Sequence, residues 1–182
     1  MGEILTPLCE LGQKYKTDKF RPHNYTTEYY RRLNERRLEV RKVLEIGIWK
    51  GRSLRMWEEF FPNARIYGID NNPKRIFKAG RIECFEGDQL HQKRLAFLAK
   101  SVGGQFDVIV DDGLHEPRHN IKAMMALVRF LTKDGLYFIE DILGDPYEIA
   151  RFLPPWFKHE VYEGEKPIVS GGFEKMLIIS RC

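Results

Sequence analysis

A chain of 182 residues is long enough to bury a hydrophobic core and is predicted to form one globular domain. Its 30 basic and 26 acidic residues leave a net charge of only +4, so we expect no nucleic-acid partner. The three cysteines match neither a zinc-ligand spacing nor a disulfide framework. With no signal-peptide pattern and no apolar run of about 18 residues, the sequence predicts a cytoplasmic protein with no membrane partner.

Residues 1–38 precede the first expected strand and are predicted to form an N-terminal helical cap. Thr6 is a candidate N-cap followed by proline, which predicts a short helix over 6–11. A second helix is predicted over 25–37. Its basic residues alternate with acidic ones at helical spacing, which favours a solvated helix face over a nucleic-acid surface.

Residues 43–54 have the pattern of a strand, a glycine turn and the start of a helix, which opens many nucleotide-binding units. Trp49 stands where a dinucleotide fingerprint would carry its second glycine, so we do not expect a pyrophosphate here. A smaller ligand with a carboxylate in place of a phosphate fits better. The alternative is an ordinary turn in a protein whose ligand lies elsewhere.

A second strand, predicted over 64–69, ends at Asp70. An acid about 20 residues after such a turn is placed to bind both hydroxyls of a ribose. Together, Glu45, Gly47, Gly51 and Asp70 favour an adenosine-bearing ligand without a diphosphate. S-adenosylmethionine (SAM) is the obvious candidate.

The rest of the chain alternates between apolar strands and helices. Strands are predicted over 41–46, 64–69, 81–86, 106–111 and 135–140, and helices over 52–61, 73–79, 90–101 and 117–131. This alternation predicts a parallel sheet with helices on both faces. In the tail, 159–162 and 175–180 are predicted to form an antiparallel strand pair joined through Gly171 and Gly172. The expected class is α/β, with a mostly parallel seven-stranded sheet in a domain spanning 39–182.

The sharpest chemical signal is a set of acids at neighbouring strand ends. Asp111, Asp112 and His115 follow the fourth predicted strand, and Glu140 with Asp141 follows the fifth. Carboxylates brought together repel one another and require a cation or a proton. Oxygen ligands without a nearby thiolate favour Mg²⁺, with Mn²⁺ or Ca²⁺ as alternatives. Each group taken singly is more often structural, but their convergence in one crevice favours an active site with His115 as general base.

The run 43–142 resembles the metal-dependent sugar O-methyltransferases of macrolide biosynthesis, the mycinamicin and demethylmacrocin type of class I SAM-dependent enzymes. The matching motifs are Leu44-Glu45-Ile46-Gly47, Gly51-Arg52-Ser53-Leu54-Arg55-Met56-Trp57, Ile66-Tyr67-Gly68-Ile69-Asp70, Gly87-Asp88-Gln89, Asp111-Asp112-Gly113-x-His115 and Ile139-Glu140-Asp141. Upstream, Lys14-Tyr15-x-Thr17-Asp18-Lys19 with His23 and Tyr25 also matches.

The resemblance implies a Rossmann-like fold and a role for each motif. Asp112, Glu140 and Asp141 would hold Mg²⁺, and His115 would be the base. Asp70 would hold the SAM ribose, Asp88 with Gln89 the adenine side, and Thr17, Asp18 and Lys19 the methionine end, so that the cap contributes to the SAM site. The full predicted cofactor set is Tyr15, Thr17, Asp18, Lys19, Glu45, Gly47, Gly51, Ser53, Asp70, Asp88, Gln89 and Asp111.

The leading expectation is a SAM- and Mg²⁺-dependent O-methyltransferase for a hydroxyl of a sugar or a glycosylated natural product. A catechol-like diol as acceptor and a non-catalytic SAM-binding protein are the alternatives. Two departures from the resembled family stand out. Leu114 replaces the usual serine beside His115, and the extra N-terminal domain through which the macrolide enzymes assemble is not seen. These departures leave acceptor size and a homo-oligomeric state open.

Overall fold

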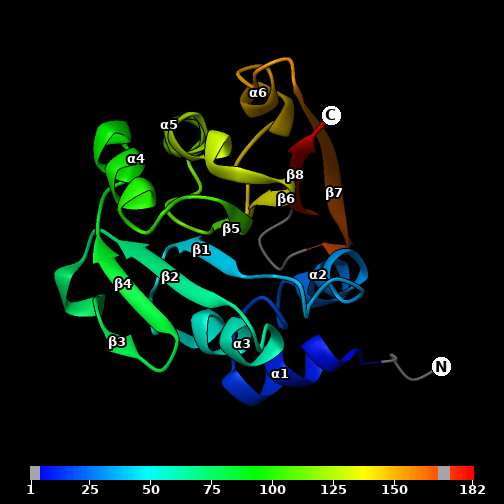
Figure 1. Cartoon of the computed structure of the whole chain (residues 1–182). Helices are drawn as coiled ribbons and strands as arrows, with labels where there is room; N and C mark the ends of the chain where they lie inside the picture. The colour runs from blue at the N-terminus through cyan, green and yellow to red at the C-terminus, as the bar shows by residue number, and fades with distance from the viewer. Residues whose placement is uncertain (1–4, 168–172) are drawn as a thin grey trace.

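The fold is built on one sheet that runs through the middle of the molecule (Figure 1). The computed structural model describes residues 5–167 and 173–182. Within them, eight strands follow the order β3-β4-β2-β1-β5-β6-β8-β7. The strands are β1 (Lys42–Ile46), β2 (Arg65–Asp70), β3 (Lys78–Ala79), β4 (Ile82–Glu86), β5 (Phe106–Asp111), β6 (Leu131–Ile139), β7 (Phe157–Pro167) and β8 (Phe173–Arg181).

The centre of the sheet is parallel and its edges are antiparallel. β1 pairs in parallel with β2 and β5, and the parallel pairing continues to β4 on one side and to β6 on the other. β8 lies antiparallel between β6 and β7, which confirms the expected C-terminal strand pair. After β1, the strands β2 and β4 are added on one side of it, and β5 and β6 are added on the other side. The strand order therefore reverses between β1 and β5, which is where ligands bind in doubly wound sheets. The predicted Rossmann-like class is therefore confirmed.

Helices cover both faces of the sheet (Figure 1). On one face lie α1 (Pro7–Tyr15), α2 (Tyr25–Leu33) and α3 (Arg52–Phe60), whose apolar side chains join Val43, Ile66 and Phe138 of the sheet in one buried cluster. On the other face α4 (Gln92–Ser101), α5 (Pro117–Leu127) and α6 (Pro146–Ala150) build a second cluster. No helix in the described ranges is both long and apolar enough to span a lipid bilayer.

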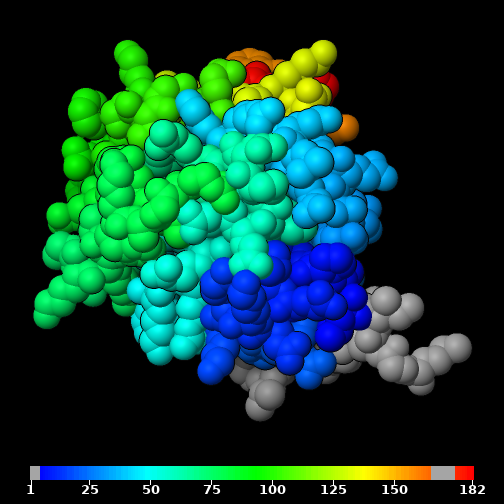
Figure 2. Space-filling model, turned by 60° about the horizontal axis from the view of Figure 1, so that its bottom comes forward, coloured from blue at the N-terminus to red at the C-terminus, as the bar shows by residue number. Residues whose placement is uncertain are grey.

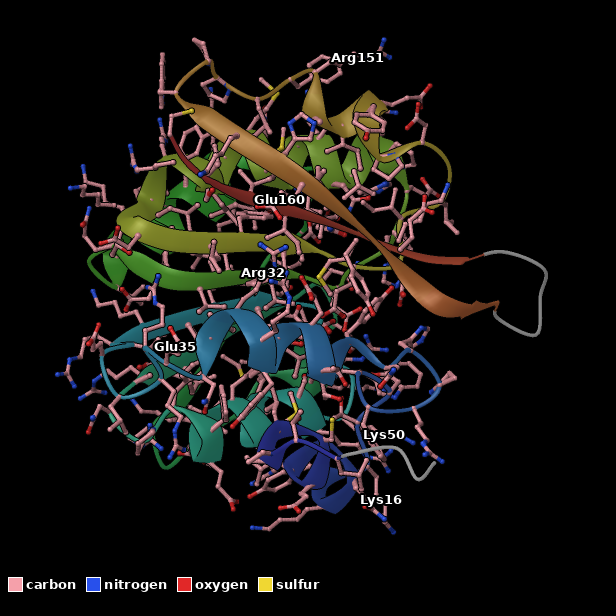
Figure 3. The ribbon with its side chains drawn as sticks, turned by 90° about the vertical axis from the view of Figure 1, so that its right-hand side faces the viewer. Lys16, Arg32, Glu35, Lys50, Arg151 and Glu160 are labelled. Carbon is pink, nitrogen blue, oxygen red and sulfur yellow. The ribbon has the colours of Figure 1, made fainter. Side chains whose placement is uncertain are left out.

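The N-terminal segment packs closely against the sheet domain. The Thr6 side chain caps α1 by accepting a hydrogen bond from the Cys9 amide at 3.2 Å. Figure 2 shows the dark-blue region of α1 forming one continuous surface with the cyan region of the chain that includes α3. On the neighbouring side, Arg32 of α2 donates to Glu160 of β7 at 2.8 Å, and the two side chains point toward each other in Figure 3.

Several predicted boundaries are wrong. The helix expected over 73–79 is a single 3₁₀ turn, η1 (Pro73–Arg75), followed by β3, which pairs antiparallel with β4 and raises the strand count from seven to eight. Backbone pairing at this sheet edge replaces the helix, and the chain then turns at Gly80 with a φ of +56°.

Three other elements also differ from the prediction. α2 ends at Leu33, before the predicted 37, and a second 3₁₀ turn, η2 (Val128–Phe130), replaces the end of the helix predicted over 117–131. The five-residue α6 was not predicted, because so short a helix leaves no periodic pattern. The predicted turn at Gly171 and Gly172 lies outside the described residues.

The cysteines give a first test of this packing. Cys9 and Cys84 are buried, at 2 % and 6 % exposure, and burial raises the pKa of Cys84 to about 11, so its thiol stays protonated at pH 8. Cys182 is exposed. We expect a disulfide-exchange reagent at pH 8 to modify one thiol per chain rapidly, and all three after denaturation in guanidinium. Rapid modification of two or three thiols in the native protein would contradict the fold.

Candidate active site

The strand register places the predicted site residues at one edge of the sheet. Ile46 of β1 lies opposite Ile69 of β2 and Asp111 of β5, and Asp111 lies opposite Ile139 of β6. The residues that follow these positions therefore leave the sheet side by side, at the carboxyl ends of the parallel strands. This alignment brings the glycine turn after β1 next to the acids after β2, β5 and β6.

A cavity of about 520 Å³ opens at this edge, a size in the range of small-molecule sites. Nine of the predicted site residues line it: Thr17, Asp18, Gly47, Ser53, Asp70, Asp88, Gln89, Asp112 and His115. The structure therefore brings together residues from the N-terminal segment, from the turn after β1 and from the ends of β2, β4 and β5.

The glycine turn is packed against the end of β5. Gly47 has a φ of +93°, and a Cβ built on it would lie 1.9 Å from the carbonyl oxygen of Asp112. Only glycine fits a positive φ and so close a backbone approach. The Gly47 amide donates to Ile69 at 2.9 Å, and the Asp112 amide donates to Ile46 at 3.0 Å. These contacts fix the cavity floor between β1 and β5.

Asp70 is held as a carboxylate at the end of β2. Its oxygens accept hydrogen bonds from the Ile48 and Asn72 amides, both at 2.9 Å, and Arg75 lies 3.2 Å away. Burial disfavours its charge, but the hydrogen bonds from Asn72, Ile48 and Arg75 outweigh burial and lower the Asp70 pKa. Arg75 also stacks on the Trp49 ring, 4.8 Å from its centroid. A charged acceptor therefore faces the cavity where a ribose was expected.

Gln89 connects the ends of β4 and β5. Its amide nitrogen donates to Asp111 at 2.6 Å, and its amide oxygen accepts from the Leu114 backbone at 2.9 Å. Asp111 is completely buried, which raises its pKa to about 7. Asp111 therefore contributes by orienting Gln89, and it does not line the cavity.

Asp112, His115 and Asp141 converge beside the cavity. One ligand atom from each lies within 4.8 Å of those of the other two, and His115 Nε2 is 3.8 Å from Asp112 Oδ1. His115 and Asp141 have φ values of +62° and +50°, a left-handed conformation that costs free energy and that clusters at functional sites. The two carboxylates are suitable oxygen donors for a divalent ion, so this group fits the predicted metal, with the His115 imidazole beside it.

The N-terminal segment contacts all three predicted metal acids. Tyr25 donates to Asp141 Oδ1 at 2.7 Å, and Tyr29 donates to Glu140 Oε1. Lys19 Nζ lies 2.6 Å from Glu140 Oε2 and 2.5 Å from Asp112 Oδ2. Glu140 is 1 % exposed and points toward Lys19 and Tyr29. It therefore lies outside the group formed by Asp112, His115 and Asp141.

The remaining predicted cofactor residues are not on the cavity wall. The Tyr15 hydroxyl donates to Glu59 at the surface. Glu45 is completely buried, accepts from Trp57 Nε1 at 2.9 Å, and has a pKa raised by burial to about 7. Gly51, with a φ of +67°, precedes α3 beneath the Phe77 ring. Lys19, which was expected near a methionine group, lies among the acids.

Sequence reasoning missed a group of cations around the cavity. Lys16 and Lys50 lie at the same end of the molecule in Figure 3, and both line the cavity. The other cationic lining residues are Arg21, Arg52 and Arg75. They come from three separate chain segments, so no local spacing indicates that they meet. Such side chains are typical partners of a carboxylate.

This fold, with a cavity at the carboxyl ends of its parallel strands, is that of the Rossmann-like methyltransferase class of proteins. Residues 44–142 match the family model described as a methyltransferase domain, and the chain belongs to that family.

Two known proteins are similar in sequence to this chain. It is 38 % identical over 149 residues to the mycinamicin VI 2''-O-methyltransferase of Micromonospora griseorubida, covering 78 % of this chain and 37 % of the relative. It is 36 % identical over 181 residues to the demethylmacrocin O-methyltransferase of Streptomyces fradiae, covering 95 % and 44 %. The chain thus spans less than half the length of these two relatives.

A solved structure of the MycE methyltransferase of the mycinamycin pathway, in complex with Mg, SAH and mycinamycin VI, superposes with a TM-score of 0.78. The two are 28 % identical, and the match covers 99 % of this chain and 56 % of that one. The predicted resemblance to the macrolide sugar O-methyltransferases is confirmed.

Proposed function

We propose that the protein is a SAM- and Mg²⁺-dependent O-methyltransferase that acts on a hydroxyl of a sugar or of a glycosylated natural product. The observation that carries the proposal is the group of Asp112, His115 and Asp141 beside a cavity lined by Asp70 and Gln89. The relatives, named as O-methyltransferases of mycinamicin VI and of demethylmacrocin, support the reaction class.

In this proposal the cavity residues hold the cofactor in one orientation. Asp70 binds the ribose hydroxyls, and Asp88 with Gln89 contacts the adenine side. Thr17, Asp18 and Ser53 line the methionine end, where Lys16 and the neighbouring cations of the cavity wall favour its carboxylate. Because Thr17 and Asp18 precede the sheet, the segment 1–38 serves as a cap that contributes to the site. A homo-oligomeric state and a cytoplasmic location stay predictions.

The acids and the imidazole perform the chemistry. Asp112 and Asp141 are the ligands we assign to Mg²⁺, and Glu140 is the neighbouring acid, held by Lys19 and Tyr29. Bound Mg²⁺ supplies Lewis acidity, which lowers the pKa of a coordinated hydroxyl. His115 Nε2 accepts the hydroxyl proton, since a neutral imidazole is a suitable base near neutral pH. SAM, when bound, would supply a methyl group on a sulfonium that leaves as a neutral thioether, so no residue has to act as an acid catalyst, and the cavity residues would position the acceptor hydroxyl.

Removal of the metal tests the proposal directly. We expect methylation of a glycosylated macrolactone, followed by mass spectrometry, to fall by on the order of 10²-fold or more when EDTA replaces Mg²⁺. Activity should return when excess Mg²⁺ is added. SAM binding, measured by calorimetry, should persist in EDTA.

The same assay, run with a panel of sugar and catechol acceptors, separates the alternatives. Turnover of a catechol but of no sugar would favour the diol enzyme. SAM binding with no turnover of any acceptor would favour a non-catalytic binding protein. Full activity in EDTA would overturn the metal-dependent reaction.

A further inference from the structure

Glu45, Asp112, Glu140 and Asp141 form a group that we call the acid cluster. Among the residues that the structure describes, Lys19 carries the one amino group placed inside it. Its Nζ lies 2.5 Å from Asp112 Oδ2, 2.6 Å from Glu140 Oε2 and 3.3 Å from Glu45 Oε1. The side chain is 1 % exposed. Lys19 comes from the loop between α1 and α2, whereas its three partners come from the ends of β1, β5 and β6.

Acidic side chains outnumber the basic one at this position. Glu45, Asp112 and Glu140 surround one amino group, and Asp141 follows Glu140 directly. Burying acidic side chains is costly unless each is paired or hydrogen-bonded. Tyr29 donates to Glu140 and Trp57 donates to Glu45, but Lys19 is the cationic side chain that contacts all three acids.

The two oxygens of Asp112 have different partners. Oδ2 accepts from Lys19, while Oδ1 faces His115 Nε2 at 3.8 Å. The group of Asp112, His115 and Asp141 therefore shares Asp112 with Lys19. A divalent ion held by Asp112 and Asp141 would face an ammonium across one carboxylate, and like charges repel strongly at such short range.

We propose that Lys19 is a positioning residue that acts as a built-in counter-cation: it keeps the acid cluster folded without a divalent ion and weakens the binding of that ion. This inference rests on the metal site of the proposed function. Lys19 does not contact the reacting atoms. It acts through Asp112 and Glu140, and it sets the metal affinity of the site and the stability of the metal-free protein.

Two substitutions separate the charge of Lys19 from its hydrogen bonds. Lys19→Gln keeps a donor and removes the charge, whereas Lys19→Arg keeps the charge. Lys14→Gln is the matched control, since Lys14 lies on the same segment but pairs with Glu59 at the surface. Melting temperature would be recorded in EDTA and in 10-fold steps of MgCl₂, and Mg²⁺ affinity would be measured by calorimetry.

In EDTA we expect Lys19→Gln to melt about 6 °C or more below the wild type. Excess Mg²⁺ should restore most of this loss, because the divalent ion replaces the missing ammonium. The variant should also bind Mg²⁺ on the order of 10-fold more tightly, because a repelling charge is gone. Lys19→Arg and Lys14→Gln should keep the Mg²⁺ affinity of the wild type.

The other outcomes contradict the inference. An unchanged Mg²⁺ affinity in Lys19→Gln would make Lys19 a purely structural ion pair, and a weaker affinity would make it a helper of metal binding. A variant that does not fold at any Mg²⁺ concentration would also overturn it, since the ion should substitute for the ammonium. If the wild type itself binds no Mg²⁺, the metal site of the proposed function fails, and this inference fails with it.

Discussion

We expect His115→Ala to lower kcat by about 10²–10⁴-fold, the usual contribution of a general base. The imidazole lines the cavity, its Nε2 lies 3.8 Å from Asp112, and its backbone is held at a φ of +62°. Alanine removes the proton acceptor and leaves the carboxylates in place. The variant should therefore bind SAM with wild-type affinity in a calorimetric titration, and only turnover should be lost.

A surface histidine provides the control for this substitution. His91 precedes α4, is exposed, and makes no side-chain capping hydrogen bond, so His91→Ala should leave turnover unchanged. Turnover of His115→Ala within about threefold of the wild type would remove His115 from the mechanism. Loss of SAM binding in that variant would instead assign His115 to the cofactor site.

We expect Gly47→Ala to destabilise the protein by about 2–5 kcal/mol, from a strained positive φ and an added steric clash. The new Cβ would lie 1.9 Å from the Asp112 carbonyl oxygen, and neither backbone can move without separating the turn after β1 from the end of β5. The same shift would displace Asp112. The free energy of unfolding in guanidinium measures the first effect, and Mg²⁺ affinity measures the second.

Gly144 offers a matched comparison. It also has a positive φ, +106°, but no described atom lies within 4 Å of the Cβ that alanine would add. Gly144→Ala should therefore cost only the backbone strain, about 1 kcal/mol. Equal losses in the two variants would show that the close approach of Gly47 to Asp112 does not occur in solution.

Much of the site follows from local patterns and one geometric rule. The polar residues that follow successive apolar strands were expected to meet because parallel strands present their carboxyl ends at one edge. Asp70, Gln89, Asp112 and His115 do line one cavity. Their assigned contacts with SAM and Mg²⁺ remain predictions, which the experiments above would test.

The orientation of the individual acids could not be predicted in this way. Glu140 and Asp141 are neighbours in the chain, yet Glu140 turns inward to Lys19 and Tyr29 while Asp141 joins His115. The partners of Glu140 lie more than one hundred residues away. Tyr29 occupies an inward-facing position of a helix, which by itself predicts only a core residue.

The sequence by itself determined the alternation of strands and helices and the acids that follow the strands, because these features depend on local periodicity. Only the tertiary structure decided that two residues form an edge strand where a helix was expected, and that Lys19 enters the acid cluster. Both outcomes depend on strand pairing and on charge compensation between segments far apart in the chain, and no local sequence pattern indicates those contacts.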